Sequence, residues 1–324
     1  MAPRLLITRR LPDAVLEAAR AAFDVVVRDV ERPLNGAEAA AALGEFDAIV
    51  PTLGDALDAE AFSRADPLRC TMLANFGVGY NHIDVAAARA AGVEVSNTPG
   101  AVTDATADIG LMLLLMAARR ASAGEAMVRG GNWKGWAPTQ LLGLHLGGRT
   151  LGVVGMGRIG RAIARRCHLA LGMEVVFFNR SKVGDAGVAA RQLDSLQALA
   201  RCADAVVVAL PGGAATRHMI GADFFAAMQS HAVFVNIARG DIIDEAALIG
   251  ALESGAIAGA GLDVYAQEPR VPAALRALQN VTLLPHLGTN ALEVRTQMGM
   301  MALENLRAWA QGLAPPNRVP EPAA

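Results

Sequence analysis

The chain has 324 residues, of which 53% are hydrophobic and 19% are charged, and its formal net charge is −2. This length predicts about two domains with large apolar cores, and the charge offers no basic footprint for nucleic acid. The three cysteines, Cys70, Cys167 and Cys202, form neither a disulfide framework nor a metal-binding motif. We therefore expect a reducing, cytoplasmic setting and no metal.

Strand and helix patterns alternate through the first hundred residues. Short apolar runs predict strands at 4–8, 25–27, 46–50, 71–75 and 93–96, and helical patterns fall at 12–22, 36–43, 58–64 and 85–91. Such alternation predicts a parallel sheet covered by helices on both faces. We expect a doubly wound α/β domain here, without a signal peptide, because the first residues lead directly into a strand.

A glycine-containing stretch, residues 75–82, follows the fourth predicted strand. Its sequence is Asn-Phe-Gly-Val-Gly-Tyr-Asn-His, and His82 stands where a dinucleotide loop requires its third glycine. The stretch is either a plain turn or a loop whose free N–H groups bind a small anion. We favour the anion loop, because such folds bind ligands at the carboxyl ends of their parallel strands.

Residues 103–129 predict one long or broken helix, and we place the domain boundary at its start. Its apolar segment, 109–118, is about half of the roughly 20 residues that a membrane span needs, so we expect a buried helix and no membrane partner. The loop at 130–136 carries two of the three tryptophans. These rings either anchor an interface or fold back on their own core.

The second half is organised around residues 150–160. A short apolar strand is followed by Gly155, Gly157 and Gly160 in the spacing G-x-G-x-x-G, and then by a helix with an apolar face. The first glycine permits a tight turn, the second lets the backbone approach a pyrophosphate, and the third lets the helix pack on the strand. Helix N-termini also attract phosphate. We predict a dinucleotide site that includes Met156, Arg158 and Ile159.

Cofactor choice is expected at the end of the next strand, residues 174–178. NAD sites usually place Asp or Glu there to bind the ribose 2′-hydroxyl, but this chain has Asn179, Arg180 and Ser181. A neutral Asn removes the repulsion of a 2′-phosphate, and arginine pairs well with phosphate. The sequence therefore predicts a preference for NADP (NADPH). The alternative is that Arg180 is a solvated surface residue and that NAD is also accepted.

Three ionisable residues, Arg239, Glu268 and His286, each lie just beyond a predicted strand, at 232–237, 257–264 and 281–284. They therefore share the sheet edge where the nucleotide is expected. An arginine binds a substrate carboxylate bidentately, a histidine donates a proton near neutral pH, and a carboxylate orients the histidine. The same edge supplies further predicted cofactor contacts: Leu210, Pro211, Ile237, Ala238, Asp263 and Gly288.

Together these motifs resemble the D-isomer-specific 2-hydroxyacid dehydrogenase family, and most closely its glyoxylate/hydroxypyruvate reductase branch. The matching segments extend over nearly the whole chain: 75–80, 97–100, 155–160, 236–240, 261–264 and 284–288. The resemblance implies that Arg239 binds the substrate carboxylate and that His286, paired with Glu268, is the general acid/base. It also implies that Val78 and Gly79 offer N–H groups to the substrate.

Further implications of the resemblance concern the whole molecule. Asp263 would lie near the nicotinamide carboxamide, and a homodimer would form around the long helix, with Trp136 reaching the active site of the partner subunit. The fold would comprise two Rossmann-like domains with a cleft between them. Residues 1–102 plus 288–324 would form a discontinuous, flavodoxin-like substrate domain, and residues 103–287 the dinucleotide-binding domain.

The expected function is the reduction of glyoxylate, hydroxypyruvate or a similar small 2-oxo acid to the D-2-hydroxy acid, with the hydride supplied by NADPH. One alternative is a dehydrogenase for a bulkier 2-oxo acid. Another is a nucleotide-sensing, corepressor-like binding protein on the same fold, since fold alone does not decide function.

Overall fold

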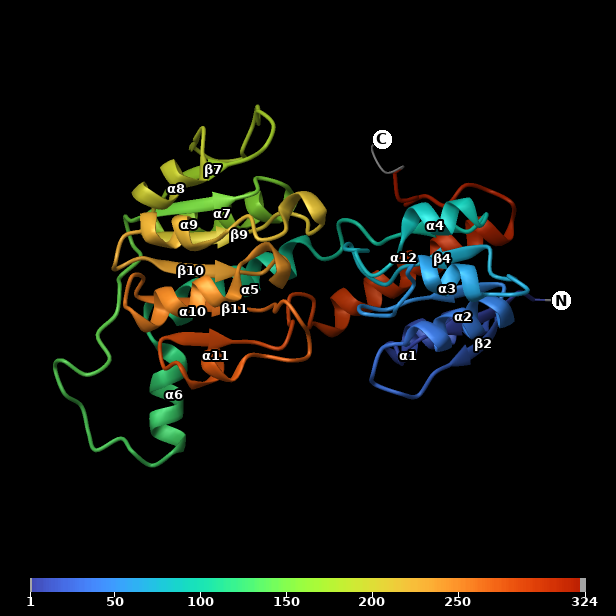
Figure 1. Cartoon of the computed structure of the whole chain (residues 1–324), viewed down its shortest axis with the longest axis horizontal. Coiled ribbons are helices and arrows are strands. Elements are labelled where there is room, and N and C mark those ends of the chain that lie inside the picture. The colour runs from blue at the N-terminus through green and yellow to red at the C-terminus, as the bar shows by residue number, and fades with distance from the viewer. Residues whose placement is uncertain (1, 321–324) are drawn as a thin grey trace. The chain divides into compact units, whose positions relative to one another are not determined.

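The computed structural model describes residues 2–320 and divides the chain into two compact units (Figure 1). Unit 1 comprises Met1–Val102 and Asn290–Ala324, and unit 2 comprises Thr103–Thr289. Unit 1 is therefore discontinuous. The second division falls two residues beyond the position expected from the sequence.

Unit 1 is a parallel α/β unit built on five strands. Its elements are β1 (Arg4–Ile7), α1 (Asp13–Arg20), β2 (Asp24–Val27), α2 (Gly36–Glu45), β3 (Ala48–Val50), α3 (Ala59–Arg64), β4 (Met72–Ala74), α4 (Val85–Ala90), β5 (Glu94–Ser96) and α12 (Leu292–Ala310). All strand pairs are parallel, in the order β2-β1-β3-β4-β5. The predicted alternation of strands and helices is confirmed.

Alternate residues of these strands supply two cores, because successive side chains point to opposite faces of a sheet. Leu5, Ile7 and Met72 face α1 and α12, whereas Leu6 and Ile49 face the layer that contains α2, α3 and α4. The last long helix, although distant in sequence, therefore completes the core of unit 1.

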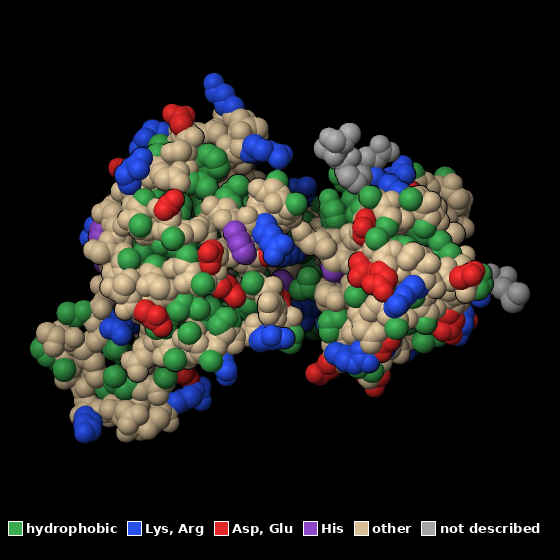
Figure 2. Space-filling model, in the orientation of Figure 1, with side chains coloured by type: hydrophobic (Ala, Val, Ile, Leu, Met, Phe, Trp, Pro, Cys, Tyr) green, Lys and Arg blue, Asp and Glu red, His purple; other side chains and the backbone are tan. Residues whose placement is uncertain are grey.

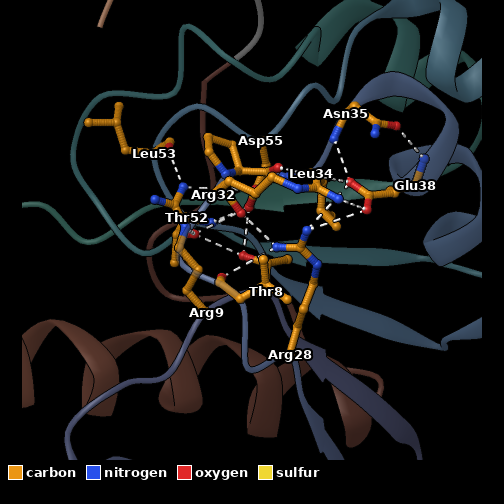
Figure 3. A network of polar contacts seen from close by, with 12 residues as sticks. Thr8, Arg9, Arg28, Arg32, Leu34, Asn35, Glu38, Thr52, Leu53 and Asp55 are labelled. Carbon is orange, nitrogen blue, oxygen red and sulfur yellow. Dashed lines mark hydrogen bonds and ion pairs between the residues drawn. The ribbon is translucent and has the colours of Figure 1, made fainter. Parts of the chain in front are cut away.

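A buried polar network ties together the loops at the carboxyl edge of this sheet (Figure 3). The carboxylate of Asp55, which is fully buried, accepts hydrogen bonds from Thr8 Oγ1 at 2.6 Å, Thr52 N at 2.7 Å and Leu34 N at 2.8 Å. Arg9 Nε donates to Thr52 Oγ1 at 2.8 Å. Buried polar groups are costly unless they are bonded in this way, so the network fixes the loops after β1 and β3.

Unit 2 is larger and has a seven-stranded parallel sheet in the order β12-β11-β10-β9-β6-β7-β8. Its elements are α5 (Thr103–Ala118), α6 (Ala121–Arg129), β6 (Thr150–Val154), α7 (Arg158–Leu171), β7 (Glu174–Phe178), β8 (Ala190–Gln192), α8 (Leu196–Cys202), β9 (Ala205–Val208), η1 (Ala214–Thr216), α9 (Ala222–Ala227), β10 (Val233–Asn236), η2 (Gly240–Ile242), α10 (Glu245–Glu253), β11 (Gly259–Leu262), α11 (Ala273–Ala277) and β12 (Val281–Leu283). The short edge strand β8 is absent from the sequence prediction, because its residues, Ala-Arg-Gln, form no apolar run.

The long helix expected at 103–129 is broken into α5 and α6 at Arg120, which adopts a left-handed conformation with φ of 52°. Helix α5 packs against α7, β10 and β11. The expectation that residues 109–118 form a buried helix is only half right, because Leu115 remains 39% exposed. Helix α6 has no buried residue and continues into a long loop that extends away from the sheet of unit 2 (Figure 1).

Within residues 2–320, no helix is both long enough and apolar enough to cross a membrane. On the face shown in Figure 2, basic and acidic side chains are interspersed over each unit, and no continuous basic surface is visible there. This distribution agrees with the small net charge of −2.

Candidate active site

The glycine loop between β6 and α7 has the backbone that its sequence predicts. Gly155 has φ of 97°, and a Cβ at this position would lie 2.8 Å from the Ala209 carbonyl oxygen. A Cβ at Gly160 would lie 2.1 Å from the Gly155 carbonyl oxygen. A left-handed turn and a close approach of helix to strand therefore require both glycines.

Gly157 differs from the other two glycines of the loop. A Cβ built there would meet no heavy atom within 4 Å, so packing within the chain does not require a glycine. Gly157 is also the N-cap of α7, and no side chain caps that helix. The open space and the unbonded helix N–H groups fit a pyrophosphate, which needs close backbone approach and favourable dipoles. Met156, Arg158 and Ile159 lie in the same turn.

The loop that follows β7 contains the residues predicted to select the cofactor. Asn179 Oδ1 accepts a hydrogen bond from Met156 N at 3.3 Å, and Asn179 Nδ2 donates to the Ser181 carbonyl at 3.0 Å. Asn179 therefore links this loop to the glycine loop. Arg180 is exposed and has no hydrogen bond or ion pair with any residue in 2–320. Its guanidinium is consequently free to meet an anion.

His286 and Glu268 come together, as the sequence predicts. His286 Nδ1 lies 2.9 Å from Glu268 Oε2, and both side chains are about 70% buried, being 29% and 30% exposed. Burial by itself raises the pKa of Glu268, but its contacts with His286, the Tyr265 N–H and the charge of Arg239 together hold that pKa below its usual range. Glu268 is therefore a carboxylate near neutral pH, and it orients the imidazole.

Asp263 fixes the backbone that carries His286. The Asp263 side chain accepts hydrogen bonds from Leu287 N at 2.7 Å and Gly288 N at 2.9 Å, and its main-chain carbonyl accepts one from His286 N at 3.0 Å. These bonds hold His286 in a left-handed conformation, with φ of 55°. Non-glycine residues adopt this conformation at a cost, and such strain gathers at functional sites.

Asp263 is 1% exposed, and this burial raises its pKa, although the two N–H donors and His286 oppose the shift. The family resemblance implies that Asp263 lies near the nicotinamide carboxamide. In the structure both of its carboxylate oxygens are engaged by the loop at 287–288.

Arg239 begins the turn after β10, beside the strands that precede Glu268 and His286. Burial lowers the pKa of Arg239 from its usual value, and the charges of Glu268 and Asp241 oppose that change. Within residues 2–320 its guanidinium donates one hydrogen bond, from Nη1 to the Ala238 carbonyl at 2.7 Å, and forms no ion pair. Its remaining donors are therefore available to a carboxylate.

Two supporting residues, Asn236 and Tyr265, are not predicted from the sequence. Asn236, fully buried, accepts from Ala238 N at 3.0 Å and donates to the Arg239 carbonyl at 2.8 Å, so it shapes the turn of Arg239. The hydroxyl of Tyr265 donates to the Leu284 carbonyl at 2.9 Å, and burial raises its pKa, so it stays protonated. The one sequence feature that could have indicated Asn236 and Tyr265 is their position at or just after the ends of predicted strands.

The other predicted cofactor contacts lie at the same sheet edge. Leu210 and Pro211 follow β9, Ile237 and Ala238 follow β10, and Gly288 lies two residues beyond His286. Because β9 and β10 are neighbours on the path from β6 to β12, these turns extend from the glycine loop towards His286. Within residues 2–320, no group of three or more His, Cys, Asp or Glu side chains is arranged to hold a metal ion.

Unit 1 has its own glycine-containing loop, between β4 and α4. Val78 and Gly79 lie in it, and neither N–H group donates a hydrogen bond to any residue in 2–320. The predicted anion-binding N–H groups are thus open. Trp136 lies in the long loop after α6 and is 83% exposed, whereas Trp133 is 54% exposed. Neither ring folds back on a core, which excludes one of the two interpretations of this loop.

Similarity to known proteins identifies the family of this chain. The sequence model described as the NAD-binding domain of D-isomer-specific 2-hydroxyacid dehydrogenases matches residues 111–288. The glyoxylate reductase of Thermococcus kodakarensis is 40% identical over 324 residues, covering 98% of this chain and 96% of that protein. The chain belongs to the D-isomer-specific 2-hydroxyacid dehydrogenase family. It falls among the relatives of glyoxylate reductases.

Solved structures agree with this assignment. The NADPH-dependent glyoxylate/hydroxypyruvate reductase of Sinorhizobium meliloti, in complex with NADP and malonate, has a TM-score of 0.87 at 35% identity, with full coverage of both chains. The D-mandelate dehydrogenase of Rhodotorula graminis has a TM-score of 0.85 at 30% identity, covering 100% of this chain and 99% of its own. The chain is thus an oxidoreductase-family protein with two parallel α/β units and a nicotinamide-nucleotide domain.

Proposed function

We propose that this dehydrogenase reduces small 2-oxo acids, such as glyoxylate and hydroxypyruvate, to 2-hydroxy acids of the D series, with NADPH as its preferred cofactor. The proposal rests mainly on the 2.9 Å contact between His286 Nδ1 and Glu268. The guanidinium of Arg239, which forms no ion pair within residues 2–320, adds a charge close to this pair. With Nδ1 occupied, Nε2 of His286 remains to face a substrate, since it bonds to no residue in 2–320.

The proposed chemistry balances as a two-electron reduction. The bound nicotinamide supplies a hydride to the carbonyl carbon and is itself oxidised. His286 donates a proton from Nε2 to the carbonyl oxygen, and Glu268 stabilises the charged imidazole before that transfer. Arg239 binds the substrate carboxylate, and the N–H groups of Val78 and Gly79 bind the same group.

The proposed preference for NADPH rests on the loop after β7. Asn179, where a carboxylate would repel a 2′-phosphate, is neutral, and the exposed Arg180 guanidinium has no partner within residues 2–320. Arginine pairs bidentately with phosphate. The Sinorhizobium meliloti relative, an NADPH-dependent reductase whose structure contains NADP, supports the same choice.

NADPH oxidation, followed by absorbance, tests the proposal with glyoxylate, hydroxypyruvate, pyruvate and phenylpyruvate. We expect the first two acids to give the highest kcat/KM, and NADPH to exceed NADH by at least about tenfold, the effect of one charged pairing. A higher kcat/KM with NADH would contradict the cofactor assignment. Absence of turnover with every acid, despite tight cofactor binding, would favour a nucleotide-sensing protein instead. The highest kcat/KM with phenylpyruvate would indicate a dehydrogenase for bulkier acids.

We also propose that the chain forms a homodimer through α6 and the loop that follows it, here called the arm (residues 119–149). The arm exposes Val128 at 61%, Trp136 at 83% and Leu142 at 67%, and Leu115 of the adjoining α5 is 39% exposed. Large apolar side chains that a segment leaves exposed to solvent are typical of protein interfaces. We expect Trp136 to reach the substrate site of the partner subunit.

A further inference from the structure

The loop at residues 76–79 of unit 1 has three successive carbonyl groups that all accept hydrogen bonds. Asn75 Nδ2 donates to the Gly77 carbonyl at 2.9 Å and to the Gly79 carbonyl at 3.1 Å. Asn97 Nδ2 donates to the Val78 carbonyl at 2.9 Å. The Thr98 N–H adds a second bond to the Gly77 carbonyl, at 3.0 Å.

These bonds determine where the intervening N–H groups point. A trans peptide is planar, so each carbonyl and the N–H of the next residue point in opposite directions. Fixing the Gly77 and Val78 carbonyls towards the asparagine amides therefore turns the N–H groups of Val78 and Gly79 away from them. Neither N–H is hydrogen-bonded to any residue in 2–320. Successive free N–H groups of this kind bind anions.

We infer that Asn75 and Asn97 are positioning residues, which hold the loop with its carbonyls bound inward so that Val78 and Gly79 present their N–H groups to the substrate carboxylate. This inference rests on the proposed function, because it assigns the anion to the carboxylate of a 2-oxo acid. The two amides act through the loop and do not themselves contact the substrate.

Asn75 can act only in the observed orientation. It follows β4, is 1% exposed, and its Oδ1 has no hydrogen-bond partner. Turning the amide over would place that oxygen against the Gly77 and Gly79 carbonyls, which are also acceptors. The structure thus leaves one buried acceptor unbonded, which is unfavourable, while both loop carbonyls are bonded.

Asn97 is itself anchored from the far end of the chain. Its N–H donates to the Asn317 carbonyl at 3.1 Å, and its carbonyl accepts a bond from Asn305 Nδ2 at 3.3 Å. Asn305 lies in α12 and is fully buried. The segment after α12 therefore fixes the backbone from which the Asn97 amide reaches the loop.

The decisive variant is Asn97→Asp. It keeps the size of the side chain but replaces the donor with a carboxylate oxygen, which repels the Val78 carbonyl where the amide attracted it. Asn97→Ala removes the bond without repulsion and serves as the milder variant. Asn317→Ala is the matched control, because it removes a neighbouring amide that bonds to Asn305 Oδ1 at 3.3 Å and to no carbonyl of the loop.

The experiment titrates the full-length enzyme, saturated with NADPH, with oxamate, whose carboxylate adjoins a carbonyl as in 2-oxo acids. We expect Asn97→Asp to weaken oxamate binding and raise the KM for glyoxylate by at least about tenfold, the effect of losing one charge-assisted contact. Because no cofactor contact changes, the Kd for NADPH should stay within about twofold and kcat should fall less than KM rises. Asn97→Ala should give a smaller effect in the same direction.

If Asn97→Asp bound oxamate as tightly as the wild type, the inference would be overturned. An equal loss of oxamate affinity in Asn317→Ala would also overturn it, because it would indicate a general effect on folding. A wild type that fails to bind oxamate would overturn it too. Failure of the proposed function would give another result: the wild type would reduce no 2-oxo acid. The loop would still be tested in that case, by oxamate binding to the wild type and its loss in Asn97→Asp.

Discussion

At the scale of single residues, Glu268 fixes the orientation of His286, because its carboxylate lies 2.9 Å from His286 Nδ1. Burial acts to raise the pKa of Glu268, but its contacts with His286, the Tyr265 N–H and the charge of Arg239 hold that pKa below its usual range. Glu268 is therefore an anion near neutral pH. With this anion at Nδ1, Nε2 of His286 is left to face the proposed substrate.

Replacing Glu268 with Gln tests this role. The amide can keep a hydrogen bond to His286 but loses the negative charge beside the ring, so kcat/KM for glyoxylate reduction should fall by about tenfold, the effect of one charge-assisted contact. Steady-state rates with NADPH saturating measure the fall. An unchanged kcat/KM would show that the charge of Glu268 is not needed.

Asp204 makes a second buried contact, at the opposite edge of the unit 2 sheet, where β9 begins. It accepts hydrogen bonds from Thr150 N at 2.8 Å and pairs with His231 Nε2 at 2.6 Å. Burial acts to raise the pKa of Asp204, but these contacts and Arg149 together lower it below its usual range. Its stabilising contribution is therefore present above the unfolded pKa, about 4, and is lost as pH falls through the folded pKa.

Asp204→Asn should accordingly lower the stability of unit 2 near neutral pH by about 2 kcal/mol, the range for a hydrogen bond to a charged group. The difference in thermal midpoint between wild type and variant should shrink below about pH 4, where the wild-type carboxylate takes up its proton. Calorimetric scans of both proteins at neutral and acid pH measure this difference in thermal midpoint. A difference that does not depend on pH would contradict the assignment.

The sequence predicted that Arg239, Glu268 and His286 share one site, because each lies shortly after an apolar run that forms a buried parallel strand. It did not identify Asn236 or Tyr265, whose roles depend on distances between turns rather than on any local pattern. The contact of His231 with Asp204 likewise joins positions 27 residues apart. Periodicity cannot show such contacts.

At the scale of elements, the edge strand β8 supports the loop at 179–183, which we propose selects the cofactor. Gln192 Nε2 donates to the Asn179 carbonyl at 3.2 Å and to the Ser181 carbonyl at 3.0 Å. Gln192 Oε1 accepts a bond from Val183 N at 3.0 Å. The sequence predicted the residues of this loop but missed the strand beside it, because Ala190, Arg191 and Gln192 form no apolar run.

Gln192→Ala should therefore loosen the loop that holds Arg180 and Ser181. We expect the ratio of kcat/KM for NADPH to that for NADH to fall by about threefold to tenfold, since each lost bond is worth about 1 kcal/mol. The kcat/KM for NADH should change little, because NADH has no 2′-phosphate. Arg191→Ala, on the adjacent and more exposed position of β8, is the control. Equal losses with both cofactors would contradict a role in selectivity.

The break between α5 and α6 also belongs to this scale. A helical pattern continues through Arg119 and Arg120 in the sequence, so the prediction left open one helix or two. The left-handed conformation of Arg120 ends α5 and lets α6 extend away from the sheet. Residues 128–140 of the resulting arm are all exposed, although Ser122 bonds to Thr282 and Leu146 is buried. A segment that is exposed all round has no apolar periodicity, so the sequence alone could not show where the helix ends.

At the scale of the whole molecule, the exposed arm underlies the proposed homodimer. Val128→Asp combined with Leu142→Asp should give a monomer, because two charges would then be buried without partners in the interface. Size-exclusion chromatography with light scattering measures the mass. Leu169→Asp is a matched control, since Leu169 of α7 is also 67% exposed but lies outside the arm. A dimer that survives the double substitution, or a monomeric wild type, would contradict the proposal.

The central claim is that His286 donates the proton in the reduction of a 2-oxo acid. The most direct measurement compares wild type with His286→Asn for NADPH oxidation by glyoxylate and, in parallel, for NADPH affinity. Since cofactor binding and proton donation use different groups, we predict that kcat/KM falls by about 10²-fold to 10⁴-fold while the Kd for NADPH stays nearly unchanged. Turnover close to that of the wild type would contradict the assignment of His286 as the acid.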